Sequence, residues 1–233
     1  MTSFQYDEQI TNNYPDLCGG VIVARGMTNA PSPAALKERY LAEQAAVKAR
    51  IGATPLSELP SLGAWRRAFS AFGVSPTKYR SAAEALLRRL TKKGDIPCIS
   101  ALVDIGNLVS IRYGLPVAIF DTRQIARPIT VHYSDGDELY TELASGEAMR
   151  PEAGEVVFSD ENKMVVARRW CWRQSATSAA NAGTTAAVIT VEAHHAGGRA
   201  DIEAAVADLL ALLNEFAGGS YESAVLDAES PSI

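Results

Sequence analysis

The stretch CISALVDIGNLVSIRYGLPVAIFD, residues 98–121, decides the fold. Residues 98–113 are apolar nearly all round, which predicts a buried helix. The run 116–121 predicts a buried strand directly after it. Gly114 and Pro116 form the corner between them, because glycine tolerates a positive φ and proline disfavours helix in the residue before it. The chain is therefore organised around one helix that leads straight into a core strand.

A stripe of polar side chains runs along this otherwise apolar helix. Ser100, Asp104, Asn107 and Ser110 follow a spacing of i, i+4, i+7 and i+10, so they share an arc of about 120°. A buried carboxylate is costly unless it is paired, so we expect Asp104 to contact a cation or backbone donors. Two interpretations stay open: the stripe is purely structural and binds neighbouring backbone or an arginine, or it faces a ligand.

Length and composition describe an ordinary globular protein. The 233 residues are 47% hydrophobic and 21% charged, and no apolar run is long enough for a spanning helix. The first ten residues lack the basic and apolar regions of a signal peptide. Cys18, Cys98 and Cys171 have no zinc-binding spacing and fit reduced thiols. We therefore expect a cytoplasmic protein with no membrane contact, no metal and no cofactor.

Positive charge is concentrated in one segment of an acidic chain. The net charge is −5, but residues 60–93 carry eight lysines and arginines against Glu84 alone. Such an island indicates an anionic partner, although solvated charges on helix faces produce the same pattern. Cations beside an aromatic ring suit RNA, because they meet phosphates while the ring stacks on an unpaired base. The candidate RNA-binding residues are Lys78, Tyr79, Arg80, Arg88, Arg89, Lys92 and Lys93.

The rest of the chain predicts a mixture of helices and strands. Apolar residues at helical spacing predict helices at 33–51, 59–72, 82–92 and 199–216. Short apolar runs predict strands at 21–26, 129–133, 156–158, 164–170 and 185–193, with 138–143 as a further candidate. Ser81 and Glu84 form a capping-box signature. We expect one domain over residues 1–217 and a disordered acidic tail at 218–233.

A second informative stretch is ARRWCWRQS, residues 167–175. If it is extended, its side chains alternate between faces. Trp170 and Trp172 then share one face, while Cys171 lies on the other between two arginines. Such a cysteine could have a lowered pKa and act as a nucleophile, but no histidine has a spacing that supplies the base. Core packing of the tryptophans and neutralisation of nearby carboxylates by the arginines are the structural alternatives.

At this point the residues resemble a known family. LVDIGNLVSIRYGLPVAIFD is similar to the editing-domain segment of the bacterial phenylalanyl-tRNA synthetase beta subunit, which follows the pattern VVDxTNYVxxExGxPxHAFD. GVSPTKYRSAAEALLRR and RRWCWRQS are similar to free-standing proteins built from this B3/B4 domain. The resemblance covers about residues 60–195 and extends less clearly to 217. The positions in register are Val103, Asp104, Asn107, Gly114, Pro116, Phe120 and Asp121.

The resemblance implies an α+β fold: a mixed, partly barrel-like β-sheet core flanked by helices. In the synthetase this domain hydrolyses tyrosine wrongly attached to the phenylalanine tRNA. The implied partner is tRNA or aminoacyl-tRNA rather than DNA. Two departures alter the amino-acid pocket: a histidine of the family pattern is Ala118 here, and a glycine-rich stretch is replaced by residues 170–173. Tyrosine specificity therefore does not carry over.

An aminoacyl ester is already activated, so its hydrolysis needs mainly a positioned water and a stabilised oxyanion. The catalytic candidates are Asn107, Asp104 and Glu161, and the substrate-binding candidates are Arg169, Arg173, Trp170, Trp172 and Asp121. We expect Asn107, Arg169 and Arg173 to project into one cavity. Three functions stay open: a trans-acting editing hydrolase, an RNA-binding module without chemistry, and a small-molecule-binding protein that reuses the fold.

Overall fold

The helix and strand formed by residues 98–121 lie at the centre of the structure. The helix is α5 (Ala101–Tyr113) and the strand is β3 (Val117–Asp121). Gly114 ends α5 with a left-handed φ of 65°, and its N–H donates to the carbonyl of Ser110. Glycine permits this helix ending because it has no Cβ to clash. The corner expected from the sequence is thus confirmed.

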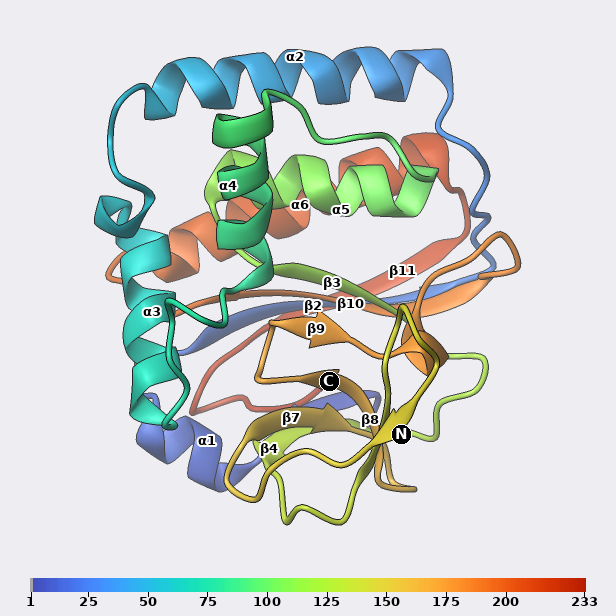
Figure 1. Ribbon diagram of the computed structural model, residues 1–233. Helices are drawn as coiled ribbons and strands as arrows, with labels where there is room; N and C mark the ends of the chain where they lie inside the picture. The colour runs from blue at the N-terminus through green and yellow to red at the C-terminus, as the bar shows by residue number, and fades with distance from the viewer. Residues whose placement is uncertain (1) are drawn as a thin grey trace.

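The computed structural model describes residues 2–233, whose elements stack in layers (Figure 1). The long helix α2 (Ala34–Ile51) lies outermost, over a layer that contains α5 and α6 (Gly198–Phe216). A four-stranded sheet lies beneath these helices, and a larger sheet lies beneath that. No helix in the described residues combines the length and apolar character needed to cross a bilayer. Shorter helices are α1 (Glu8–Asn13), α3 (Pro60–Ala71) and α4 (Ala82–Lys93), with 3₁₀ turns at Leu56–Glu58 and Ala176–Ser178.

Both sheets are open. The four-stranded sheet is antiparallel in the order β11–β2–β10–β3. The larger sheet is mixed, in the order β1–β4–β7–β8–β5–β6 with β9 beside β8, and its parallel pairs are β1 with β4 and β5 with β8. One antiparallel and one mixed sheet, together with the helices, confirm the expected α+β class. The strands are β1 (Phe4–Tyr6), β2 (Cys18–Arg25), β4 (Ile129–Tyr133), β5 (Leu139–Thr141), β6 (Ala148–Met149), β7 (Val156–Ser159), β8 (Met164–Arg168), β9 (Arg173–Gln174), β10 (Ala186–Ala193) and β11 (Ser220–Leu226).

Two large apolar cores hold the layers together, and Tyr140, Val157 and Val165 form a third, small cluster. One lies between the helices and the four-stranded sheet and includes Leu108 of α5. The other is rich in aromatic rings and includes Phe158 and Trp170. Strand β3 contributes to both, with Ile119 in the first and Phe120 in the second, because successive strand side chains point to opposite faces. Full burial of each such side chain contributes roughly 1.5–3 kcal/mol.

The C-terminal residues correct a prediction from the sequence. Residues 218–233 are not a disordered tail, because β11 pairs with β2 along its whole length. Beyond β11, the N–H of Ile233 donates to the carbonyl of Phe4 (3.0 Å). The segment is small and polar, so composition alone suggests disorder. Its order comes from backbone pairing with β2, which local composition does not reveal.

Candidate functional site

The basic segment folds into α3, a loop and α4, and its contacts place α4 beside the turn between β8 and β9. Ser81 caps α4 by accepting the N–H of Glu84 (3.2 Å), as the capping-box signature predicts. The N–H of Ala82 donates to the carbonyl of Cys171 (3.0 Å) in that turn. The buried Glu84 carboxylate pairs with Arg66 (2.7 Å). The start of α4 is therefore fixed by its contacts with the β8–β9 turn and with Arg66 of α3.

An open groove of about 980 Å³ is lined by α4, α5, the end of the β8–β9 turn and the loop before α4. Its lining also includes apolar side chains, among them Ile99 and Leu143, which are exposed. Among the charged members, Lys92 and Lys93 form no ion pair within residues 2–233. Tyr79 is the one RNA-binding candidate that does not line the groove. The cations of the groove are Lys78, Arg80, Arg88, Arg89, Lys92, Lys93 and Arg173.

Asn107 and Arg173 share this groove, whereas Arg169 does not. Asn107 reaches it from α5 and Arg173 from β9. The Arg169 side chain is nearly buried, with its guanidinium 4.1 Å from the ring centre of Tyr79 and 4.9 Å from that of Trp172. Arg169 therefore supports the wall of the groove from behind and does not face a ligand.

The four residues between β8 and β9 form a turn instead of the extended strand expected from the sequence. Arg169 and Trp170 both have a left-handed φ, of 45° and 58°. Side chains other than glycine rarely adopt this conformation, so surrounding contacts must hold it. The Glu155 carboxylate accepts the N–H of Arg169 (3.0 Å) and pairs with the buried Arg168 (2.8 Å). The expected alternation is lost: Trp170 is fully buried, and Trp172 reaches the groove.

A small cavity of about 80 Å³ adjoins the groove between β3, β10 and the β8–β9 turn. The linings of the groove and the cavity have Ala82, Val117, Trp172 and Arg173 in common. The two spaces are therefore neighbours, with Arg173 at their junction. A ligand whose charged part lies in the groove could place a short extension in the cavity.

Glu192 of β10, which sequence patterns alone do not single out, lines this cavity and is 2% exposed. Its Oε1 accepts hydrogen bonds from the Tyr6 hydroxyl (2.9 Å) and the Trp170 indole (3.1 Å), while Oε2 has no hydrogen-bond partner in residues 2–233. Burial raises the pKa of Glu192 to about 7, although the two hydrogen bonds oppose the rise. A carboxyl group with such a pKa accepts and donates protons near neutrality. The overlooked signal is a lone charge in the apolar run 186–193.

Cys171 lines the cavity beside Glu192 but is not an activated thiol. Burial raises the pKa of Cys171 well above its usual range, and the Glu192 carboxylate raises it further. The thiol is therefore protonated near neutral pH, contrary to the lowered pKa that a cysteine nucleophile needs. His194 is neutral as well, because burial lowers its pKa to about 3. The raised pKa of Cys171 thus favours the neutral thiol over the thiolate that a cysteine nucleophile requires.

Asp104 is fully buried, as expected, and its partners are a hydroxyl and the backbone. One carboxylate oxygen accepts the hydroxyl of Ser32 (2.5 Å) and the other accepts the N–H of Ile99 (2.8 Å). The second bond holds residues 98–100 outside the helix, so α5 begins at Ala101 and not at 98 as the sequence predicts. Asp104 thus anchors the start of α5 and faces neither the groove nor the cavity.

Two other polar candidates also lie outside the groove and the cavity. Ser110 donates its hydroxyl proton to the carbonyl of Leu115 (2.7 Å), which stabilises the corner after α5. Glu161 is exposed in the turn between β7 and β8 and lines neither space. Of the proposed catalytic residues, Asn107 is the one that the structure places in the groove.

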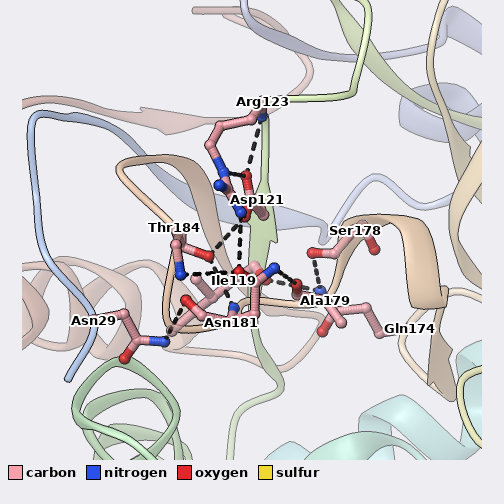
Figure 2. Close-up of polar contacts among 10 residues, drawn as sticks. Asn29, Ile119, Asp121, Arg123, Gln174, Ser178, Ala179, Asn181 and Thr184 are labelled. Carbon is pink, nitrogen blue, oxygen red and sulfur yellow. Dashed lines mark hydrogen bonds and ion pairs between the residues drawn. The ribbon is translucent and has the colours of Figure 1, made fainter. Parts of the chain in front are cut away.

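Asp121 at the end of β3 belongs to a separate polar network (Figure 2). Its carboxylate accepts hydrogen bonds from the Arg123 guanidinium and the Thr184 hydroxyl, both at 2.6 Å. Burial favours a raised pKa for Asp121, but these hydrogen bonds outweigh it and hold the pKa below its usual range. Arg123 also donates to the side chain of Asn181 (3.0 Å). Asp121 therefore joins loops together, at a distance from the groove lining.

Gln174 connects the same region to the cavity (Figure 2). Its side-chain nitrogen donates to the carbonyl of Ile119 (2.7 Å) on β3 and to the carbonyl of Ser178 (2.8 Å). Gln174 also lines the cavity. These bonds fix β9 against β3, and so they position the neighbouring Arg173 at the junction of groove and cavity.

The chain belongs to the B3/4 domain family, whose family model matches residues 64–218. This range contains all the residues that line the groove and the cavity. No curated protein matches the chain. Among solved structures, an N-terminal fragment of the phenylalanyl-tRNA synthetase beta-subunit from Pyrococcus horikoshii is similar, with 12% identity and a TM-score of 0.47. The match covers 94% of this chain and 50% of that one, so the chain spans half the length of that structure.

Proposed function

We propose that the protein binds the aminoacylated end of tRNA and hydrolyses the ester bond of mischarged aminoacyl-tRNA in trans. The observation that carries the proposal is the junction of a cationic groove with a cavity that holds a carboxyl group of pKa about 7. The groove suits the phosphates of the tRNA end, since cations supply most of the affinity for nucleic acid. The cavity suits the amino-acid side chain.

The chemistry needs one base and one cation at the ester. Glu192 takes a proton from a water molecule, and the resulting hydroxide attacks the ester carbonyl carbon. Arg173 at the junction stabilises the negative charge that develops on the carbonyl oxygen. The carbon–oxygen bond to the ribose then breaks, and the protonated Glu192 returns its proton to the ribose oxygen. Asn107 orients the terminal nucleotide from the groove wall. The products are the free amino acid and the uncharged tRNA.

Single-turnover deacylation of a panel of mischarged tRNAs tests this proposal. The rate should rise with pH through about 7, because Glu192 acts in its deprotonated form. Glu192→Gln removes the base and should lower the rate by roughly 10²–10⁴-fold. Glu38→Gln, at an exposed glutamate of α2, is the matched control and should leave the rate unchanged. Equal rates for Glu192→Gln and the unaltered protein would contradict the assignment.

A second function, tRNA binding without chemistry, is favoured by the depth of Glu192, which is only 2% exposed. In that case tRNA affinity would depend on salt while no ester in the panel is hydrolysed. A small-molecule-binding protein would instead show no salt-dependent affinity for tRNA. The deacylation panel and a salt titration together separate these three functions.

A further inference from the structure

We propose that the cavity selects aminoacyl groups by size and admits only small side chains, such as those of alanine, serine and cysteine. This inference rests on the proposed function, because it assigns the cavity to the amino-acid side chain. It deepens that function by naming the substrate class. Aromatic aminoacyl groups are excluded.

The volume of the cavity limits the size of the side chain that it can hold. The cavity measures about 80 Å³. An engineered cavity that binds benzene measures about 150 Å³. The cavity therefore has about half the space that an aromatic ring needs, which is room for roughly three non-hydrogen atoms. A tyrosine or phenylalanine side chain fits only if the walls move.

The walls of the cavity are rigid. Trp170 is fully buried, its indole N–H is bound to Glu192 (3.1 Å), and its ring packs edge-on against Trp65 with the centres 5.4 Å apart. Phe120 and Phe158 line the cavity from the aromatic core, with ring centres 5.5 Å apart. Opening the cavity would break these contacts in a close-packed core. The walls are therefore held at their present spacing.

A single small residue, Ala118, leaves the cavity volume free. Ala118 of β3 lines the cavity and pairs across the sheet with Thr190 of β10. Any larger side chain at position 118 extends into the cavity volume. Ala118→Leu is therefore a filling variant, whereas Phe158→Leu at the core wall is an enlarging variant.

Non-hydrolysable analogues of the aminoacylated end test size selection independently of catalysis. The probes are 3′-alanylamino-, 3′-serylamino- and 3′-tyrosylamino-3′-deoxyadenosine, in which an amide replaces the ester. Titration calorimetry on the full chain should show the alanyl and seryl analogues binding at least tenfold more tightly than the tyrosyl analogue. Equal or tighter binding of the tyrosyl analogue overturns the inference, and so does the absence of binding by every analogue.

Two variants sharpen the experiment. Ala118→Leu should lower the ratio of alanyl to tyrosyl affinity at least tenfold, because it fills the cavity. Phe158→Leu should also lower this ratio, because it makes room for the larger tyrosyl side chain. Leu41→Ala, at an exposed residue of α2, is the control and should show the same ratio of alanyl to tyrosyl affinity as the unaltered protein. An unchanged ratio in Ala118→Leu contradicts the inference even if Phe158→Leu fails to fold.

The two measurements, analogue binding and deacylation, show separately whether the size selection or the hydrolysis fails. Size-selective binding with no deacylation overturns the hydrolysis and leaves the cavity assignment in place. Deacylation with a preference for aromatic esters overturns the size selection and leaves the hydrolysis in place.

Discussion

At the scale of single residues, Glu192 is the most consequential side chain because it combines burial, a pKa of about 7 and an unpaired oxygen in the cavity wall. Its folded-state pKa is raised above its usual value of 4.5. Between these values the unfolded chain loses the proton while the folded chain keeps it. Stability therefore falls as pH rises from about 4.5 to 7 and is constant above that window. The charged form of Glu192 therefore lowers the free energy of unfolding, and perturbed pKa values of this kind are typical of functional sites.

This linkage predicts the stability of Glu192→Gln, which keeps the shape and removes the charge. Relative to the unaltered protein, the variant should gain about 3 kcal/mol in free energy of unfolding between pH 4.5 and pH 8. Urea denaturation at several pH values measures the difference. Glu38→Gln serves as the control and should show no such trend. A difference that does not change with pH would mean that Glu192 is not buried in its charged form.

At the scale of elements, the β8–β9 turn decides where the aromatic and cationic side chains of the site lie. Glu155 holds the turn through the buried Arg168 and the backbone of Arg169. Glu155→Gln leaves a buried arginine without its charge partner and should cost about 3–5 kcal/mol of stability. The control Glu152→Gln alters a carboxylate that is 84% exposed and should cost less than about 1 kcal/mol. Thermal unfolding of the two variants tests this; equal losses would contradict the role of the turn.

Helix α4 carries four of the seven cations that line the groove, namely Arg88, Arg89, Lys92 and Lys93. Reversal of two exposed charges, Lys92→Glu with Lys93→Glu, should weaken tRNA binding and reduce the slope of log affinity against log salt by at least about 2. Filter binding at several salt concentrations measures this slope. Arg25→Glu with Arg39→Glu reverses two charges outside the groove and serves as the matched control. If the two double variants weaken binding equally, the net charge of the protein and not the groove determines the affinity for RNA.

Much of this arrangement follows from sequence patterns, and the exceptions have physical causes. Helical periodicity predicts α2, α4 and α6, since each buries an apolar stripe. Alternation fails at Arg169 and Trp170, because both have a left-handed φ in a turn that is held by Glu155, the residue directly before the neighbouring strand β7. Sequence patterns do not single out Glu192, because the burial that raises its pKa comes from side chains of other strands and loops. Contacts between segments far apart in the chain determine both features.

At the scale of the whole molecule, β11 completes the four-stranded sheet and the residues after it reach β1. The sequence alone suggests that residues 218–233 could be removed without effect. The structure predicts the opposite: deletion would expose the edge of β2 and remove Leu226, a core side chain that is 1% exposed. A chain ending at 217 should lose several kcal/mol of stability or aggregate through the open edge. Urea denaturation and light scattering measure this, and unchanged stability would show that β11 contributes nothing.

The unequal burial of the three tryptophans has a spectroscopic consequence. Trp65 and Trp170 are sealed in the core at 1% and 0% exposure, whereas Trp172 lies at the junction of the groove and the cavity. Iodide, an anion drawn to the basic groove, should quench the emission of Trp172 and spare the other two. A nucleic acid that occupies the groove should shield Trp172 from iodide. The chain thus contains its own fluorescent reporter of groove occupancy, and binding is measurable without a label.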